Sequence, residues 1–86
     1  MEKEKLYQLK SDASKISPIL NIGKNGVTES LIEELNNKLK VNRLVKVRVL
    51  KSAEEGKDLK TIADEIAVST RSTLIDVRGR TVVLYR

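Results

Sequence analysis

The stretch Asn21–Thr28, which reads Asn-Ile-Gly-Lys-Asn-Gly-Val-Thr, constrains this chain more than any other. It lies between a short apolar run that is typical of a strand and a periodic pattern that is typical of a helix. Gly23 and Gly26 let the backbone turn sharply and approach a ligand closely, because neither carries a Cβ. A helix that begins after the loop directs unpaired N–H groups and a partial positive charge toward it, and Lys24 adds a full charge. The loop therefore predicts a phosphate-binding site, although the glycines also suit an ordinary turn that needs a positive φ.

Hydrophobic periodicity predicts three helices and four strands in a single domain that spans residues 1–86. The expected helices cover residues 3–17, ended by Pro18, a second segment from the N-cap Thr28 to about residue 40, and a third that Asp58 caps. The expected strands cover residues 19–22, 44–50, 73–77 and 81–85, with a Gly-containing loop at 53–57 and a tight hairpin turn at 78–80.

This order predicts an α/β fold with two layers, in which three helices pack on a mixed four-stranded sheet (α-β-α-β-α-β-β). Strand–helix–strand units favour parallel pairing, whereas the closing hairpin is antiparallel. Residues 44–50 alternate, so that three valines face one way while Lys46 and Arg48 face the other. The basic side of this strand predicts a sheet face that is at least partly open to solvent. The run at 82–85 is apolar on both faces, which is typical of an interior strand.

Composition argues against several classes of protein. The 86 residues contain no Cys and no His, which removes thiolate zinc sites, disulfides and the usual paired nucleophiles of enzymes. The loop is not a P-loop, because Lys24 lies between the glycines and no Gly-Lys-Ser/Thr follows. We therefore expect no enzyme activity, no cofactor and no metal. The apolar runs are too short to span a bilayer and the first residues are charged, so we expect a cytoplasmic protein outside the membrane.

Charge is distributed unevenly along the chain, whose net charge is +5. Residues 53–70 hold two lysines against five carboxylates, a net charge of −3, which leaves +8 on the rest. A positive field of this kind attracts polyanions, although a merely soluble basic domain is the plain alternative. Two tyrosines cannot build the aromatic platform of an RRM or an OB-fold. If the partner is RNA, we expect recognition mainly through phosphates, 2′-hydroxyls and RNA shape.

Several motifs follow one another along the chain. They are Leu9-Lys10 and Ala13, then Pro18 and Ile22-Gly23-Lys24-Asn25-Gly26-Val27-Thr28, then Leu44-Val45-Lys46-Val47, and the ending Gly79-Arg80-Thr81-Val82-Val83-Leu84-Tyr85-Arg86. In these residues the chain resembles a single CRM domain, the chloroplast RNA splicing and ribosome maturation module, and the stand-alone YhbY-like proteins. The match covers nearly the whole chain, and the loop together with the Leu-Tyr-Arg ending is far more specific than a lone Gly-x-x-Gly.

The resemblance implies a fold similar to the C-terminal domain of bacterial translation initiation factor three. It also implies RNA binding, with large-subunit ribosome precursors as the usual target, through a KH-like Gly-x-x-Gly loop. Together with the charges it gives the candidate RNA-binding residues Gly23, Lys24, Asn25, Gly26, Thr28, Lys10, Lys46, Arg48, Arg78 and Arg80. Each has an ordinary alternative as a turn residue, a helix cap or a solvated charge that guards a strand against aggregation.

Two other functions remain open at the level of sequence. A small basic protein can package DNA, and a preference for RNA over duplex DNA of equal length would separate that function from RNA binding. The acidic segment at residues 54–67 can instead serve as a protein-interaction adaptor, with RNA incidental. Copurification of a protein from nuclease-treated extract would support the adaptor.

Overall fold

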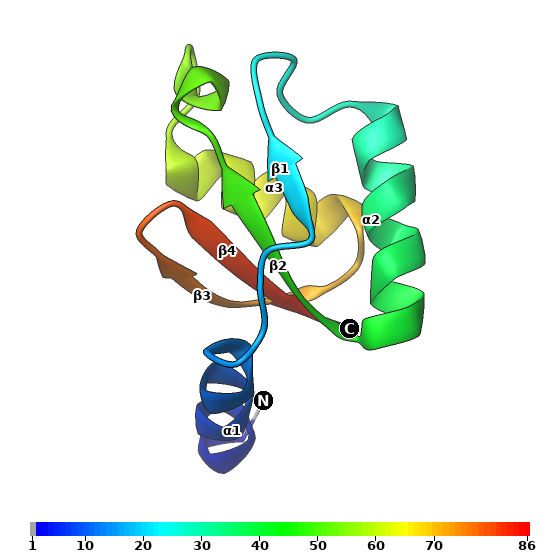
Figure 1. Cartoon of the computed structure of the whole chain (residues 1–86), viewed down its shortest axis with the longest axis vertical. Coiled ribbons are helices and arrows are strands. Elements are labelled where there is room, and N and C mark those ends of the chain that lie inside the picture. Colours follow the sequence, from blue (N-terminus) through cyan, green and yellow to red (C-terminus); the bar gives the residue numbers. More distant parts are fainter. Residues whose placement is uncertain (1) are drawn as a thin grey trace.

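The three helices and four strands expected from the sequence are present in the computed structural model, which describes residues 2–86 (Figure 1). In chain order the elements are α1 (Lys3–Ala13), β1 (Leu20–Ile22), α2 (Glu29–Asn42), β2 (Leu44–Val49), the 3-10 turn η1 (Lys51–Glu54), α3 (Leu59–Ser69), β3 (Thr73–Arg78) and β4 (Thr81–Tyr85). The strands form one sheet in the order β1-β2-β4-β3. β1 pairs with β2 in parallel, whereas β4 pairs antiparallel with both β2 and β3, so the sheet is mixed as predicted.

Two of the helices begin at the residues that the sequence indicates. Thr28 Oγ1 accepts a hydrogen bond from the backbone N–H of Leu31 at 3.1 Å, and Asp58 Oδ1 accepts one from the N–H of Thr61 at 2.8 Å. Each cap satisfies an N–H group that the first turn of a helix leaves unpaired. The caps therefore fix where α2 and α3 start relative to the strands that precede them.

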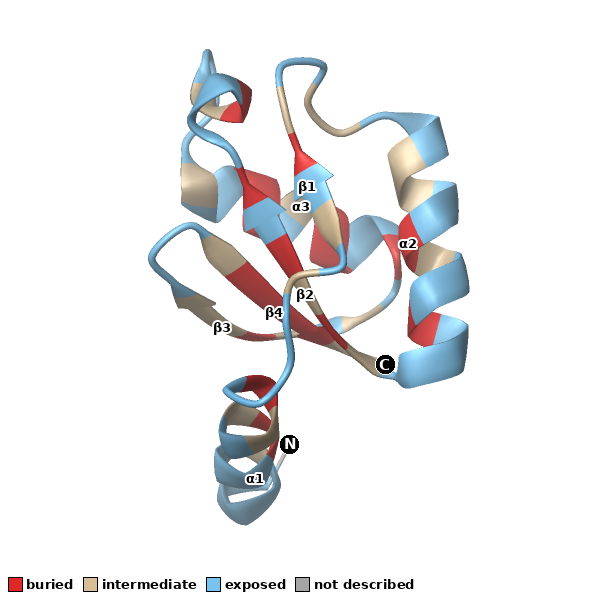
Figure 2. Cartoon of the chain, viewed as in Figure 1, coloured by how far each residue is buried: buried red, intermediate tan, exposed pale blue. Residues whose placement is uncertain are grey.

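The main core lies between the sheet and the helices α2 and α3. Val45, Val47 and Val49 of β2 are at most 1% exposed and face these helices, as the alternation in the sequence predicts. Val82 and Leu84 of β4 are fully buried in the same core, which confirms β4 as an interior strand. Figure 2 shows the buried residues concentrated on β2, β4 and the inner sides of the two helices.

Helix α1 packs on the other face of the sheet, at one end, and builds a second, smaller core. Leu9 and Ala13 of α1 are buried against Ile75 and Val83. The two layers expected from the sequence thus describe the larger part of the domain, and α1 adds a partial third layer. A β-bulge in β3 between Leu74 and Asp76 supports it, because it directs the consecutive residues Ile75 and Asp76 to the α1 side. The rest of this sheet face is left uncovered by helices.

Several predicted boundaries differ from those of the structure. The first helix ends at Ala13 and not at residue 17, because the chain turns at Ser14, whose hydroxyl donates to the carbonyl oxygen of Ser11 at 2.6 Å. Such a local bond competes with the continuing helix. The segment 53–57, predicted to be a loop, is preceded and partly occupied by η1, and β2 ends at Val49.

Candidate functional site

The Gly-Lys-Asn-Gly loop forms a tight turn at the end of β1. The backbone N–H of Gly26 donates to the carbonyl oxygen of Gly23 at 2.9 Å, which closes the turn and leaves Lys24 and Asn25 exposed at its tip. Within the described part of the chain, Lys24 takes part in no ion pair. A free ammonium group and an amide that can donate or accept therefore lie side by side at the most prominent point of the turn.

The two glycines of this loop differ in what the fold requires of them. Gly26 has a φ of 69°, in the left-handed region that side chains with a Cβ rarely adopt. Gly23 lies outside that region, and a Cβ added to it would lie 3.6 Å from Leu50 Cδ1, an ordinary van der Waals distance. The turn therefore explains Gly26, but neither backbone conformation nor crowding explains the absence of a side chain at Gly23.

The N-terminus of α2 follows the loop but is already capped. Thr28 is a candidate RNA contact, but its hydroxyl oxygen accepts a hydrogen bond from the N–H of Leu31 and so caps the helix. Glu29 in the first turn places a carboxylate beside the cap. The partial charge of the helix is thereby matched within the protein, and Lys24 and Asn25 remain the clearest groups for an external anion.

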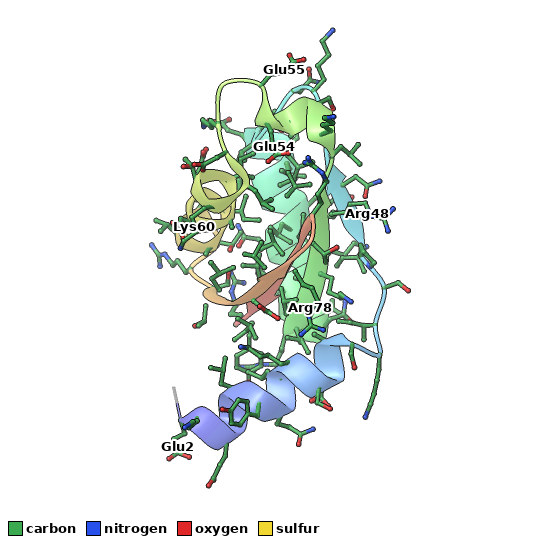
Figure 3. All side chains as sticks on the ribbon, turned by 90° about the vertical axis from the view of Figure 1, so that its left-hand side faces the viewer. Glu2, Arg48, Glu54, Glu55, Lys60 and Arg78 are labelled. Atoms are coloured by element: carbon green, nitrogen blue, oxygen red, sulfur yellow. The ribbon has the colours of Figure 1, made fainter. Side chains whose placement is uncertain are left out.

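Four polar residues form a row across the uncovered face of the sheet. Asn21 pairs with Arg48, Arg48 pairs with Thr81, and Thr81 pairs with Arg78. Residues paired in this way on neighbouring strands share one face, so we call Asn21, Arg48, Thr81 and Arg78 the cross-sheet row. Both arginines are exposed, and in Figure 3 Arg48 projects on the side of the molecule opposite to Lys60 of α3. Asn21 leads directly into the loop that carries Lys24.

A pocket of about 130 Å³ lies between the cross-sheet row and α1. Its polar lining residues are Lys10, Ser14, Lys46, Asp76, Arg78 and Thr81. Lys46 Nζ donates to the carbonyl oxygen of Ile16 at 3.1 Å, and Arg78 Nε lies 3.9 Å from Asp76 Oδ2. Lys10 is half-buried and joins no ion pair within residues 2–86. Three cations against one carboxylate leave this pocket basic.

Arg80, also a candidate contact, lies apart from this group. Its guanidinium forms an ion pair with Glu54 at the end of η1, and its carbonyl oxygen accepts from the N–H of Val49 at 2.7 Å. The structure thus brings Lys10, Lys46, Arg48 and Arg78 together, while Arg80 joins the hairpin to η1. The candidate residues from the sequence did not include Asn21, Ser14 and Thr81, although the alternation of the strands gave a signal for Asn21 and Thr81.

A group of acidic residues lies on the other side of the domain. Glu29 and Glu33 of α2 and Glu65 of α3 line a groove between these helices, with a volume of about 650 Å³. Part of the charge is matched locally, since Lys57 Nζ lies 2.6 Å from Glu65 and Lys60 Nζ lies 3.1 Å from Asp64. The domain therefore has a basic face on the uncovered side of the sheet and an acidic groove behind it.

One titratable group of the domain has a clearly shifted pKa, and the shift comes from helix capping. Hydrogen bonds from the Thr61 side chain and backbone lower the pKa of the Asp58 carboxyl, which reflects its work as a helix cap. Among the residues that the structure describes, no group of three or more potential ligands is placed to hold a metal ion. No helix in this part of the chain is long and apolar enough to cross a membrane.

The chain is similar to one protein family and to several known proteins along most of its length. The family model of the CRS1 / YhbY (CRM) domain matches residues 1–86. The probable RNA-binding protein YqeI of Bacillus subtilis is 36% identical over 78 residues, which cover 91% of this chain and 79% of YqeI. An RNA-binding protein of Haemophilus influenzae is 35% identical over 78 residues, which cover 91% of this chain and 77% of that protein. The solution structure of the hypothetical protein SAV1595 from Staphylococcus aureus matches with a TM-score of 0.81 and 35% identity, over 100% of this chain and 88% of that one.

Proposed function

Because the chain belongs to the CRS1 / YhbY (CRM) domain family, we propose that it binds structured RNA through the Gly-Lys-Asn-Gly loop and the basic face of the sheet. The relatives named above are described as RNA-binding or probable RNA-binding proteins. The observation that carries the proposal is the continuity of the surface. Lys24, at the exposed tip with Asn25, lies three residues after Asn21, which is in the cross-sheet row beside Arg48.

Each part of this surface contacts a different part of the RNA. Gly23 lets the ribose-phosphate backbone lie against the loop, and Lys24 contacts a phosphate. Arg48 and Arg78 continue the phosphate track across the sheet, and Lys10 and Lys46 extend it toward α1. Most of these residues are charged and none of them is aromatic, so binding depends on the RNA backbone and its shape and falls steeply with salt.

We further propose that the RNA is a large-subunit ribosome precursor and that the protein assists its assembly in the cytoplasm. The proposed activity is binding without catalysis. The carboxylates Asp64, Glu65 and Asp76 each have a cationic neighbour, and none of the three is paired with a group that would activate it.

The test is crosslinking and sequencing of the RNA bound in cells, with wild type compared to a Lys24→Ala, Asn25→Ala double variant. Enrichment of large-subunit ribosomal RNA that drops in the variant is the expected result. Enrichment of DNA, or no RNA above background, would contradict the proposal. Binding that survives the double change would keep the function but move the main contact to the sheet or α1.

A second candidate function is that of an adaptor, which the groove between α2 and α3 favours. The groove has Ile32 and Val27 along its apolar lining and the carboxylates of Glu29 and Glu33 at its edge, a combination suited to a basic peptide segment. A Glu29→Gln, Glu33→Gln variant that loses a protein partner in nuclease-treated extract, with RNA binding unchanged, would favour this function. Retention of all partners would oppose it.

A further inference from the structure

A second group of cations lies where α2 and α3 end. It consists of Lys40, Arg43, Arg71 and Arg86, which we call the helix-end cluster. Three of them line a pocket of about 270 Å³, together with Asn36, Ser69 and Thr70. No Asp or Glu lines this pocket, and none of the four cations pairs with an Asp or Glu side chain within the described residues. Figure 1 shows this end of the domain at the end of α2 that is remote from the Gly-Lys-Asn-Gly loop.

Two of these arginines occupy backbone positions that favour glycine. Arg43 has a φ of 62° and Arg71 a φ of 54°, both in the left-handed region. Arg43 directly follows α2, and Arg71 follows Thr70, the residue that caps the end of α3. A helix that ends in this way usually carries Gly or Asn at that position, because a Cβ there is strained. The N–H of Ser72 donates to the carbonyl oxygen of Ala67 at 3.0 Å, which completes the helix-ending turn around Arg71.

The fold makes use of two of the three arginine side chains. Arg43 Nη2 donates to the carbonyl oxygen of Arg86 at 3.2 Å, and Arg86 Nη2 donates to Asn36 Oδ1 and to the carbonyl oxygen of Thr70, both at 2.5 Å. The side chain of Arg71 is different, since it is exposed and makes no hydrogen bond or ion pair with the rest of residues 2–86.

The usual explanation for cations at helix ends is the negative partial charge of the last carbonyl groups. That charge accounts for Lys40, which lies in the last turn of α2. It does not account for a strained arginine at position 71, where glycine would relax the backbone and Lys40 and Arg86 would still supply positive charge. The strain at Arg71 is therefore not offset by any hydrogen bond or ion pair of its side chain within residues 2–86.

We propose that the helix-end cluster is a second phosphate-binding site, which holds the backbone of the same RNA at a point distinct from the loop. This inference rests on the proposed function. Arg86 is held in place by Asn36 and Thr70, and Arg71 extends a free guanidinium beside it. A planar guanidinium fork matches the oxygens of a phosphate, and two guanidinium groups in one pocket supply enough donors to hold a phosphodiester.

The geometry also sets the spacing of the two sites. Helix α2 has 14 residues between them, which corresponds to about 21 Å along its axis. Glu29 and Glu33 line the groove behind this helix and repel phosphates there. The RNA therefore meets the loop and the helix-end cluster as two separate contacts, which suits a folded RNA better than a short single strand.

The experiment compares Arg71→Gly with wild type. Glycine relaxes the left-handed backbone, so the melting temperature is expected to stay the same or rise while RNA affinity falls several-fold. The probe is a synthetic RNA stem-loop with a single-stranded tail, measured by fluorescence anisotropy over a series of salt concentrations. Loss of one phosphate contact lowers the salt slope by about one. Lys60→Gln is the control with the same change in charge, because Lys60 lies on α3 and pairs with Asp64.

Three outcomes separate the possibilities. A loss of affinity in Arg71→Gly, together with RNA-induced shifts of the wild-type Ser72 and Arg86 amides in NMR spectra, supports the second site. Equal affinity of Arg71→Gly and wild type, while Lys24→Ala binds more weakly, overturns the second site and leaves the proposed function intact. Absence of binding by wild type itself overturns the proposed function and with it this inference.

Discussion

The guanidinium of Arg86 donates a hydrogen bond of 2.5 Å to the backbone carbonyl oxygen of Thr70, a fully buried residue at the end of α3. This contact joins the residue after β4 to the residue that ends α3. Part of the Leu-Tyr-Arg ending thus has a structural explanation. Leu84 is buried in the core, and Arg86 forms a hydrogen bond with the residue that caps the end of α3.

We expect Arg86→Ala to lower the free energy of unfolding by about 2 kcal/mol, because a charge-assisted hydrogen bond is lost and a buried carbonyl loses its partner. Urea unfolding of the variant and wild type measures the difference. Arg48→Ala is the control, since Arg48 is exposed and forms no ion pair within residues 2–86. Equal destabilisation by both changes would contradict the role of Arg86.

Substitution of the two loop glycines should affect different properties, with Gly26 needed for stability and Gly23 for RNA binding. Gly26→Ala puts a Cβ into a left-handed backbone and is expected to destabilise the protein by about 1 kcal/mol. Gly23→Ala meets only Leu50 at van der Waals distance and is expected to leave stability unchanged while it weakens RNA binding. Thermal unfolding and RNA titration of the two variants test the pair. Unchanged RNA affinity in Gly23→Ala would mean that the RNA backbone does not approach this glycine.

Lys24→Ala is expected to weaken binding to most RNAs alike, because it removes a phosphate contact and no base contact. The slope of the logarithm of affinity against the logarithm of salt should flatten by about one unit at most. Titrations with several unrelated RNAs at a series of salt concentrations measure both effects. A loss confined to one sequence would show that Lys24 reads a base.

The arginines at the hairpin should differ in their effect on RNA. Arg78 lies in the cross-sheet row and is only loosely paired with Asp76, whereas Arg80 is engaged by Glu54. We therefore expect Arg78→Ala to lower RNA affinity more than Arg80→Ala, although both remove the same charge. A larger loss in Arg80→Ala would place the RNA over η1 instead of the open sheet face.

The cap of α3 should make stability depend on pH in acid. The folded-state pKa of Asp58 is lowered by its bonds from Thr61, so the ionised form stabilises the folded protein. This contribution is present above the unfolded-state pKa and is lost as the pH falls through the lowered folded-state pKa. Asp58→Ala should therefore unfold more easily than wild type near neutral pH, and the difference should shrink in strong acid. A constant difference over that range would contradict this linkage.

Much of this architecture could be predicted because local signals and tertiary packing agree. The alternation of Val45, Val47 and Val49 fixed which face of β2 is buried, and the caps Thr28 and Asp58 marked the starts of two helices. The similarity to the C-terminal domain of translation initiation factor three stays a prediction. So do the assignments of individual residues to RNA contacts, which depend on a partner that no feature of one chain describes.

The errors arose where single hydrogen bonds or contacts distant in sequence decide the outcome. Helix α1 ends where the Ser14 hydroxyl donates to the carbonyl oxygen of Ser11, and the segment after it is held by Lys46, thirty residues from Ile16, whose carbonyl oxygen accepts from the Lys46 ammonium. The placement of α1 on the opposite face depends on the bulge that turns Ile75 toward it. The pairing of Arg80 with Glu54 was equally invisible, because η1 has no periodic pattern long enough to predict.

The position of β4 in the middle of the sheet governs when this domain can fold during synthesis. β4 pairs with both β2 and β3, so a nascent chain that has grown only to Arg80 has no strand to join them. Until Val82 and Leu84 emerge, the valines of β2 lack their partners, and the intermediate exposes apolar surface. Folding is therefore delayed until nearly all of these residues have been made. Chains that terminate before β4 should stay unfolded and be degraded by proteases, and they should not form a shorter functional domain.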